Sequence, residues 1–215
     1  MDDVIKSKKV KISEQQRLQN LTELERQYWE KGLFVAGMDE VGRGPLAGPV
    51  VTACVIMPPE PLIEGINDSK KLSEKKRTIL SPIIRETAIA YKIEYVSPQI
   101  IDEINIAEAT KLCFCNSFNN MEVKCAHVLV DYVSGLKIDA EQIPLVHGDA
   151  ISYSIGAASI IAKVERDNYM IAMHELYPQY NFAKNKGYGT REHIEAIKKY
   201  GPCPIHRHSF IKNFI

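Results

Sequence analysis

Carboxylates stand at three places where a short apolar run ends. Asp39 and Glu40 follow the segment LFVAG, Asp131 follows HVLV, and Asp149 follows LVHG. Runs of this kind are typical of buried strands, and side chains from several strand ends converge in an α/β sheet. We therefore expect these four carboxylates to meet at one site.

A carboxylate cluster has a defined chemistry. Converging carboxylates repel one another, and their pKa values rise unless divalent cations are bound. Ligand sets made only of oxygen select hard ions such as Mg²⁺ or Mn²⁺. Two such ions about 3.5 to 4 Å apart stabilise the attacking and leaving oxygens in phosphodiester cleavage, which predicts a nuclease. The alternative for a single acid is an ordinary turn residue, and Asp149 could cap a nearby helix.

A glycine-rich turn follows the first two acids. Neighbours on a regular strand point to opposite faces, so Asp39 and Glu40 share one site only if the backbone turns there. Gly42 and Gly44 supply that freedom and let a substrate approach the main chain, while Arg43 offers a planar fork for phosphate. The alternative is a purely structural turn, in which the glycines only reverse the chain and bind no substrate.

A second glycine-containing loop, NKGYGT at 185–190, carries an aromatic side chain. The ring of Tyr188 could lie on a sugar or base while its hydroxyl contacts a ribose 2′-OH. A loop with one packing aromatic is the alternative. The histidines are too scattered for a zinc hydrolase, which leaves most of them structural or on the surface, with His147 beside the expected site.

The overall charge gives no signal for a polyanionic partner, because 27 Lys and Arg balance 27 Asp and Glu. Cationic residues nevertheless gather at 69–77 and at 184–212, either to bind nucleic acid or as solvated helix faces. The 215 residues contain no apolar run of membrane-spanning length and no signal-peptide core, so we expect a cytoplasmic protein.

The helices and strands that must position these residues can be predicted from the periodicity of apolar residues and from the residues that begin and end each run. Helices are expected at 13–31, 73–88, 97–121 as one or two helices, 152–177 and 191–201. Strands are expected at 33–39, 48–58, 88–96, 126–133 and 143–149, the first two as an antiparallel hairpin. This order predicts an α/β fold, with a mixed sheet flanked by helices and a small helical region at the C-terminal end. The expected units are 1–32, 33–178 and 179–215. Pro82 should lie in the first turns of its helix or kink it.

Six segments together resemble the signature blocks of bacterial ribonuclease HII. They are MDEVGRGPLAGPV, DSKKLSEKKR, LVD, GDAISYSIGAASIIAKVERD, NKGYGT and GPCPIHRHSF, in the family's order between Val35 and Phe210. The resemblance implies an RNase H-like fold and endonucleolytic cleavage of RNA in RNA–DNA hybrids, including a single ribonucleotide in duplex DNA. Ribonuclease HIII is less similar, because it carries an extra N-terminal domain and a different glycine turn.

The resemblance also implies roles for individual residues. Asp39, Glu40, Asp131 and Asp149 match the ligands of Mn²⁺ or Mg²⁺. Gly42, Arg43 and Gly44 match the reader of the 2′-OH, Tyr188 matches the tyrosine that senses the RNA-to-DNA junction, and Lys70 matches a position near substrate phosphates. The expected reaction is a two-metal, in-line hydrolysis that leaves a 3′-hydroxyl and a 5′-phosphate.

Four positions depart from the usual pattern of the family. Tyr132 stands where glycine is commoner, His147 and Ile151 where lysine is frequent, and Gly156 replaces an alanine. These changes bear on metal preference, on substrate binding and on local stability. The effect on stability concerns Gly156, because a glycine inside a helix costs about 1 kcal/mol relative to alanine. None removes a carboxylate.

Two other functions fit parts of the sequence. A non-catalytic nucleic-acid-binding module would use the basic tail and Tyr188, and would gain no thermal stability from Mn²⁺. A two-metal nuclease for DNA junctions would cleave DNA without any ribose. We expect a monomer that binds nucleic acid and no membrane. The tail SFIKNFI is either a sliding-clamp motif or an apolar end packed on the body.

Overall fold

The computed structural model describes residues 12–213 and 215. The strands are β1 (Val35–Val41), β2 (Val50–Ile56), β3 (Ala90–Val96), β4 (His127–Asp131) and β5 (Glu141–Leu145). The helices are α1 (Glu14–Leu21), α2 (Glu23–Trp29), α3 (Glu74–Thr87), α4 (Pro98–Asn119), α5 (Gly148–Ile151), α6 (Tyr153–Leu176), α7 (Phe182–Asn185), α8 (Arg191–Tyr200) and α9 (His208–Ile211). Two 3₁₀ turns cover Ser69–Lys71 and Pro178–Tyr180. Among these residues, no helix has the length and apolar character needed to cross a membrane.

The sheet has the order β3-β2-β1-β4-β5 and is mixed, as the sequence predicts. β1 and β2 form the expected antiparallel hairpin, with Met38 opposite Cys54, and β3 extends it on the far side of β2. β4 joins the other edge of β1 in parallel, with Met38 opposite Val130. This pairing places Asp131, the last residue of β4, beside Asp39 in the middle of the sheet.

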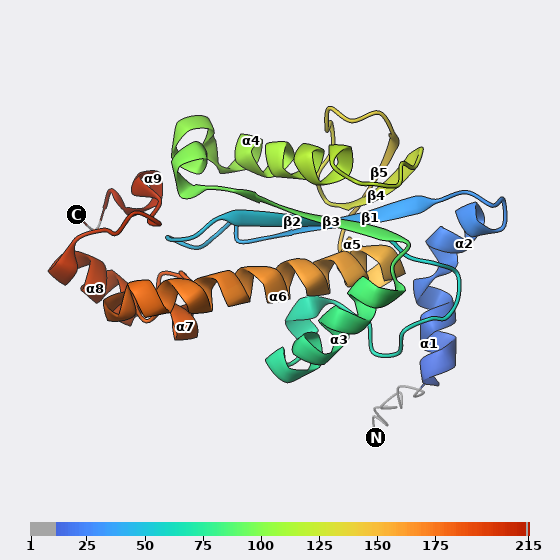
Figure 1. Cartoon of the computed structure of the whole chain (residues 1–215), viewed down its shortest axis with the longest axis horizontal. Helices are drawn as coiled ribbons and strands as arrows, with labels where there is room; N and C mark the ends of the chain where they lie inside the picture. The colour runs from blue at the N-terminus through green and yellow to red at the C-terminus, as the bar shows by residue number, and fades with distance from the viewer. Residues whose placement is uncertain (1–11, 214) are drawn as a thin grey trace, which may run out of the picture.

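Helices cover both faces of the sheet (Figure 1). α4 lies on one face, and α6 with α3 lies on the other. Every residue of β2 is buried, in keeping with its run of apolar residues. α6 approaches β1 so closely that a Cβ atom at Gly37 would lie 2.2 Å from the carbonyl carbon of Ser154. This contact fixes the start of α6, and the short α5 before it, next to Asp39.

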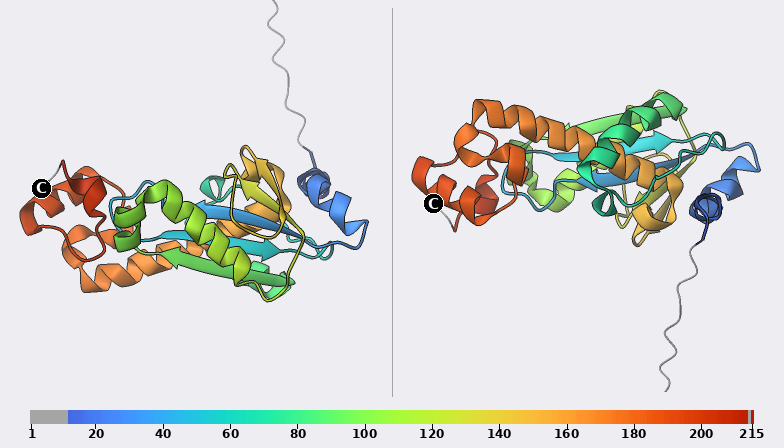
Figure 2. Two further views of the ribbon diagram at one scale, coloured as in Figure 1. Left: turned by 90° about the horizontal axis from the view of Figure 1, so that it is seen from above. Right: turned by 90° about the horizontal axis from the view of Figure 1, so that it is seen from below.

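The two ends of the elongated molecule carry the remaining helices (Figure 2). α1 and α2 lie at one end, and α7, α8 and α9 gather at the other. Leu18 and Leu21 of α1 contribute to the main apolar core. The C-terminal helices form their own apolar cluster, which also includes Ala47 and Met170 and is therefore joined to the glycine turn and to α6. The unit boundaries at 32/33 and 178/179 stay a prediction.

Several elements differ in detail from the sequence-based expectation. The helix expected at 13–31 breaks at Thr22 into α1 and α2. Pro82 lies inside α3, so of the two arrangements expected for it, a place in the first turns is wrong. The segment 97–121, expected to form one or two helices, is two helical pieces separated by a kink at Asn105, whose φ is +68°. With ψ 166° as well, Asn105 lies in a backbone region that is otherwise almost exclusive to glycine. Its side chain accepts hydrogen bonds from the amides of Ala107 and Glu108, which starts the second helical piece.

Candidate active site

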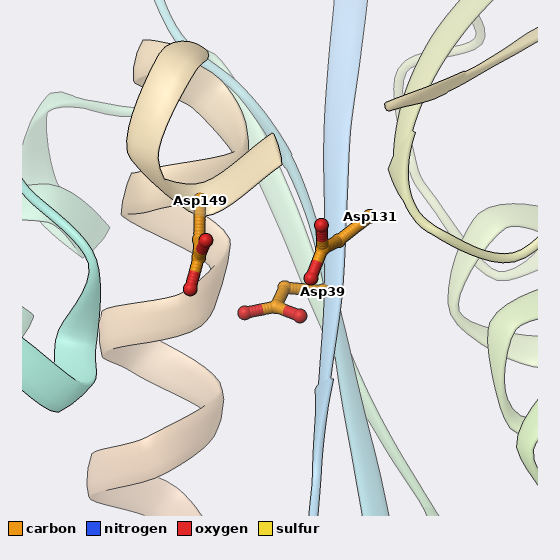
Figure 3. Close-up of side chains that lie close together, drawn as sticks. All are labelled: Asp39, Asp131 and Asp149. Atoms are coloured by element: carbon orange, nitrogen blue, oxygen red, sulfur yellow. The ribbon is translucent and has the colours of Figure 1, made fainter. Parts of the chain in front are cut away.

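Three of the predicted acids meet on the α6 face of the sheet. One carboxylate oxygen from each of Asp39, Asp131 and Asp149 lies within 4.8 Å of the other two. Figure 3 shows Asp39 on β1, Asp131 at the end of β4 and Asp149 on the short helix in front of α6, all pointing toward one space. The group matches the convergence that the sequence predicts for these three residues.

Asp149 is carried by a different element from the one expected. β5 ends at Leu145, and Asp149 lies in the first turn of α5 rather than at a strand end. It does not cap α6 either, because the cap of α6 is the side chain of Ser152, which accepts from the amide of Ile155. The main chain of α5 is tied to the cluster, since the amide of Gly148 donates to Asp131 Oδ1 at 2.7 Å.

Glu40, the next residue of β1, does not belong to this three-carboxylate group. β1 continues with regular antiparallel pairing to Val41, so the backbone does not turn at Asp39 and Glu40, and the expectation that it would is wrong. Glu40 Oε1 lies 3.5 Å from Arg43 Nη1, while its buried Oε2 has no hydrogen-bond partner in the described part of the chain. Its role as a metal ligand stays a prediction.

The electrostatics of the cluster favour a bound cation. Burial, and then the charge of Glu40, hold the pKa of Asp39 well above its ordinary value. Burial and the neighbouring Asp68 raise the pKa of Asp149. Asp149 Oδ2 is buried and accepts no hydrogen bond from any described residue, although Lys70 Nζ lies 3.5 Å away. An oxygen-only set with an unsatisfied buried oxygen fits a hard divalent ion.

The glycine turn after β1 is held by two fully buried arginines that sequence reasoning missed. Arg166 of α6 donates to the carbonyls of Pro49 and Ala47, both at 3.0 Å. Arg207 donates to the carbonyls of Arg43 at 2.9 Å and Gly48 at 2.8 Å, and also to that of Gly42. Both side chains are 0% exposed. The only indication in the sequence was that Arg166 lies in the segment AKVERD and Arg207 in PIHRHSF, both within the signature blocks. Their spacing along the chain does not distinguish them from surface cations.

Gly42 and Gly44 serve different purposes in this turn. Gly42 has φ +92°, and a Cβ atom there would lie 2.2 Å from Arg166 Nε, so packing requires the glycine. At Gly44 the only atom within 4 Å of an added Cβ, among the described residues, is Cε1 of Tyr188 at 3.9 Å. The main chain at Gly44 is therefore open on the side that faces Tyr188.

The loop that carries Tyr188 is joined directly to the turn. The amide of Leu46 donates to the carbonyl of Gly187 at 2.8 Å, and Arg166 also donates to the carbonyl of Lys186 at 2.9 Å. Tyr188 itself is 44% exposed, so its ring is available to a ligand. The structure thus brings together the glycine turn and Tyr188, which the sequence had placed in separate motifs.

The four positions that set this sequence apart from the resemblance lie next to Asp131 or Asp149. Tyr132 adopts φ +59° directly after Asp131 and is 70% exposed. His147 precedes α5 with φ +57°, and Ile151 ends α5 with an exposed side chain. A Cβ atom at Gly156 would lie 3.1 Å from Ile66 Cγ2 and 3.3 Å from the carbonyl oxygen of Asp149. The glycine therefore allows close approach of α6 to the Asp149 segment, and alanine would not simply add stability there.

Comparison of the sequence with known proteins matches it to one family. The family model described as Ribonuclease HII matches residues 36–213. Ribonuclease HII of Caldanaerobacter subterraneus subsp. tengcongensis is 53% identical over 93% of this chain and 83% of its own length, and that of Caldicellulosiruptor bescii is 48% identical over 92% and 96%.

Solved structures show the same fold. Ribonuclease H2 of Pyrococcus horikoshii superimposes with a TM-score of 0.73 at 28% identity, over 85% of this chain and 97% of that one. The RNase HII in the PCNA complex from Archaeoglobus fulgidus gives 0.70 at 27% identity, over 84% and 96%. Bst-RNase HIII, solved with Mn²⁺, shares the fold at 15% identity with a TM-score of 0.59, over 79% of this chain and 63% of that one. This chain belongs to the ribonuclease HII family and is a nuclease with an RNase H-like fold.

Proposed function

We propose that this chain is an endonuclease that cleaves the RNA strand of RNA–DNA hybrids and single ribonucleotides embedded in duplex DNA. The observation that carries the proposal is that Asp39, one of three clustered carboxylates, lies on β1. The turn that follows β1 has an open main chain that faces an exposed tyrosine. Membership of the ribonuclease HII family supports the same substrate class.

The carboxylates are the proposed ligands of Mn²⁺ or Mg²⁺. Asp39, Asp131 and Asp149 would hold an ion between them. Glu40, whose pKa is raised by burial and by the charge of Asp131, is the proposed fourth ligand. When bound, the ions supply charge stabilisation at the attacking and leaving oxygens, which corresponds to products with a 3′-hydroxyl and a 5′-phosphate. The protein holds the carboxylates in place through β1, β4 and the hydrogen bond from Gly148 to Asp131.

The turn and the loop beside it are the proposed readers of ribose. The main chain from Gly42 to Gly44 can approach a 2′-OH, which is the group that distinguishes RNA from DNA at one nucleotide. Arg43, with a half-exposed side chain, would contact a phosphate, and Tyr188 would pack on the sugar from the facing side. Lys70, exposed and 3.5 Å from Asp149, would contact a neighbouring phosphate.

A single substrate set tests the function. A labelled DNA duplex with one ribonucleotide should be cut at that nucleotide when Mn²⁺ is present and left intact without divalent ions. A duplex of identical sequence without ribose should remain uncut. Cleavage of the all-DNA duplex would favour a DNA nuclease, and binding without cleavage would favour a non-catalytic module. Asp131→Asn should abolish cleavage while leaving the fold intact.

Part of the C-terminal tail packs against the rest of the protein. Ile211 is fully buried, and Phe210 packs under the guanidinium of Arg207 with 5.1 Å between the carbon Cζ and the ring centre. The Archaeoglobus fulgidus relative was solved in complex with PCNA. Ile211 is therefore not available to a sliding clamp, and we do not include a clamp contact in the proposed function.

A further inference from the structure

Two histidines face each other in the apolar cluster at the C-terminal end of the molecule. His193 of α8 is 0% exposed and His206 is 1% exposed. Their Nε2 atoms lie 3.0 Å apart, which is a hydrogen-bonding distance. The rings of Tyr180 and Phe182 enclose the pair, with centroids 4.8 Å from His206 and 5.3 Å from His193 respectively. A neutral pair suits these surroundings, because an unpaired buried charge is costly.

The partners at the outer ends of the pair determine where the protons are. His193 Nδ1 lies 2.9 Å from the carbonyl oxygen of Tyr188, which can only accept, so Nδ1 carries the hydrogen. The amide of Cys203 donates to His206 Nδ1 at 2.9 Å, so that nitrogen is an acceptor. The hydrogen of neutral His206 is then on Nε2, and it is donated to the bare Nε2 of His193.

One alternative proton arrangement exists. His206 Nδ1 also lies 3.1 Å from Sγ and 3.3 Å from the carbonyl oxygen of Cys203, and a hydrogen on Nδ1 could be donated to either atom. In that case the two Nε2 atoms would face each other at 3.0 Å with lone pairs only, and the shorter bond from the Cys203 amide would be lost. The arrangement with opposite tautomers satisfies all four ring nitrogens.

We infer that His193 and His206 form a buried relay of neutral, opposite tautomers that positions Tyr188, a role that rests on the proposed contact of Tyr188 with the substrate. The relay runs from the amide of Cys203 through both rings to the carbonyl of Tyr188. That carbonyl also accepts from the amide of Thr190 at 2.8 Å, so its two lone pairs are both used. His193 and His206 are positioning residues, because neither is placed against the substrate.

Nitrogen-15 NMR of the histidine side chains in the full chain at neutral pH tests the relay itself. We expect one buried imidazole protonated on Nδ1 and one protonated on Nε2, with the first signal missing from His193→Gln and the second from His206→Gln. Two identical tautomers, or an imidazolium at either position, would overturn the relay. This measurement requires no substrate, so it separates the relay from the proposed function.

Kinetics with paired substitutions test the positioning role. The amide of glutamine can replace Nε2 but not Nδ1, whereas that of asparagine can replace Nδ1. His193→Gln should therefore lower kcat/KM on the one-ribonucleotide duplex about tenfold, and His193→Asn should restore much of it. The matched control is His208→Gln, which changes an exposed histidine outside the relay and should have no effect.

A double substitution shows whether the relay acts through Tyr188. In a Tyr188→Ala background, His193→Gln should cause no further loss of kcat/KM, because the ring that it positions is gone. Additive losses would overturn the positioning role, even with the tautomers confirmed. Absence of cleavage by the unsubstituted chain would overturn the proposed function instead, while the NMR result would still decide the relay.

Discussion

Gly44 and Tyr188 face each other across the opening of the proposed ribose site, since a Cβ atom added at Gly44 would lie 3.9 Å from Tyr188 Cε1. The two residues come from segments that are far apart in the sequence. Arg166 joins these segments by donating to the carbonyls of Ala47 on one and Lys186 on the other. The side chain of Arg166 on α6 thus sets the distance between the glycine turn and the ring of Tyr188. The same helix packs against β1, the strand that carries Asp39.

Gly44→Ala should reduce the preference for ribose and leave metal binding intact. The added methyl group makes only an ordinary contact with Tyr188, so the fold is kept, but it fills the space through which a sugar would reach the main chain. We expect the kcat/KM for the one-ribonucleotide duplex to fall about tenfold or more. The stabilisation by Mn²⁺, measured as a shift in Tm, should match that of the unsubstituted chain.

Gly42→Ala is the matched comparison, because it changes the other glycine of the same turn. Its Cβ atom would collide with Arg166 and its φ is +92°, so we expect a loss of about 2 kcal/mol or more in the free energy of unfolding. Equal destabilisation by the two alanines would show that the turn needs both glycines for its shape, and the role of Gly44 as an open approach would be wrong.

Asp39→Asn should stabilise the metal-free protein and abolish its response to Mn²⁺. Because burial raises the pKa of Asp39 in the folded state, the carboxylate costs stability as the pH rises above its ordinary value of 3.8. The neutral amide removes this cost, by about 1 to 3 kcal/mol at neutral pH. Thermal unfolding with and without Mn²⁺ measures both effects, and a retained shift in Tm with Mn²⁺ would exclude Asp39 as a ligand.

Arg166→Lys should destabilise the protein strongly although the charge is kept. The guanidinium donates to three main-chain carbonyls in fixed directions, and a lysine ammonium cannot reproduce this fork. We expect the free energy of unfolding, measured in urea, to fall by about 3 kcal/mol, because buried carbonyls are left without donors. Arg191→Lys, at an exposed position on α8, is the control and should stay within about 0.5 kcal/mol of the unsubstituted chain. A comparable small loss at Arg166 would mean that the turn holds its shape without this side chain.

The sequence predicted most elements because local signals and tertiary packing agree in them. Ser73, Ser97 and Ser152 each stand before a helical apolar pattern, and each caps the helix that the structure shows. The short helix that carries Asp149 escaped prediction because four residues are too few to display a periodicity.

The parts of the site that escaped prediction depend on contacts between distant segments. Arg207 belongs to a run of cations that indicated either a nucleic-acid partner or a solvated surface, yet its guanidinium is buried against carbonyls of the turn. His193 and His206 were assigned to structural or surface positions, and only the fold shows that they are bonded to each other. Spacing along the chain carries no information about such pairs, because the residues are brought together by the packing of α8 and the C-terminal segment on α6.

The free energy of unfolding should fall with decreasing pH through the titration of His206. Burial, and then the neighbouring His193, lower its pKa to about 4 in the folded state, against 6.5 for an ordinary histidine. Below pH 6.5 the unfolded chain therefore takes up a proton that the folded chain does not, so stability is complete above pH 6.5 and declines as the pH falls toward 4. The groups around the ring are the thiol of Cys203, the hydroxyl of Tyr180, and His193 and His208, and none of them offers a carboxylate to offset the charge.

The size of this effect is up to about 3 kcal/mol, because each unit of pKa corresponds to about 1.36 kcal/mol. Urea unfolding of the full chain between pH 7 and pH 4 measures it against His206→Gln, which keeps a donor near Nε2 and has no titratable group. The difference between the two proteins should be largest at pH 7 and shrink toward pH 4, while the acids of the carboxylate cluster contribute equally to both and cancel. A constant difference across this range would mean that His206 binds its proton with the same affinity in the folded and unfolded chains, which contradicts a neutral, buried imidazole at this position.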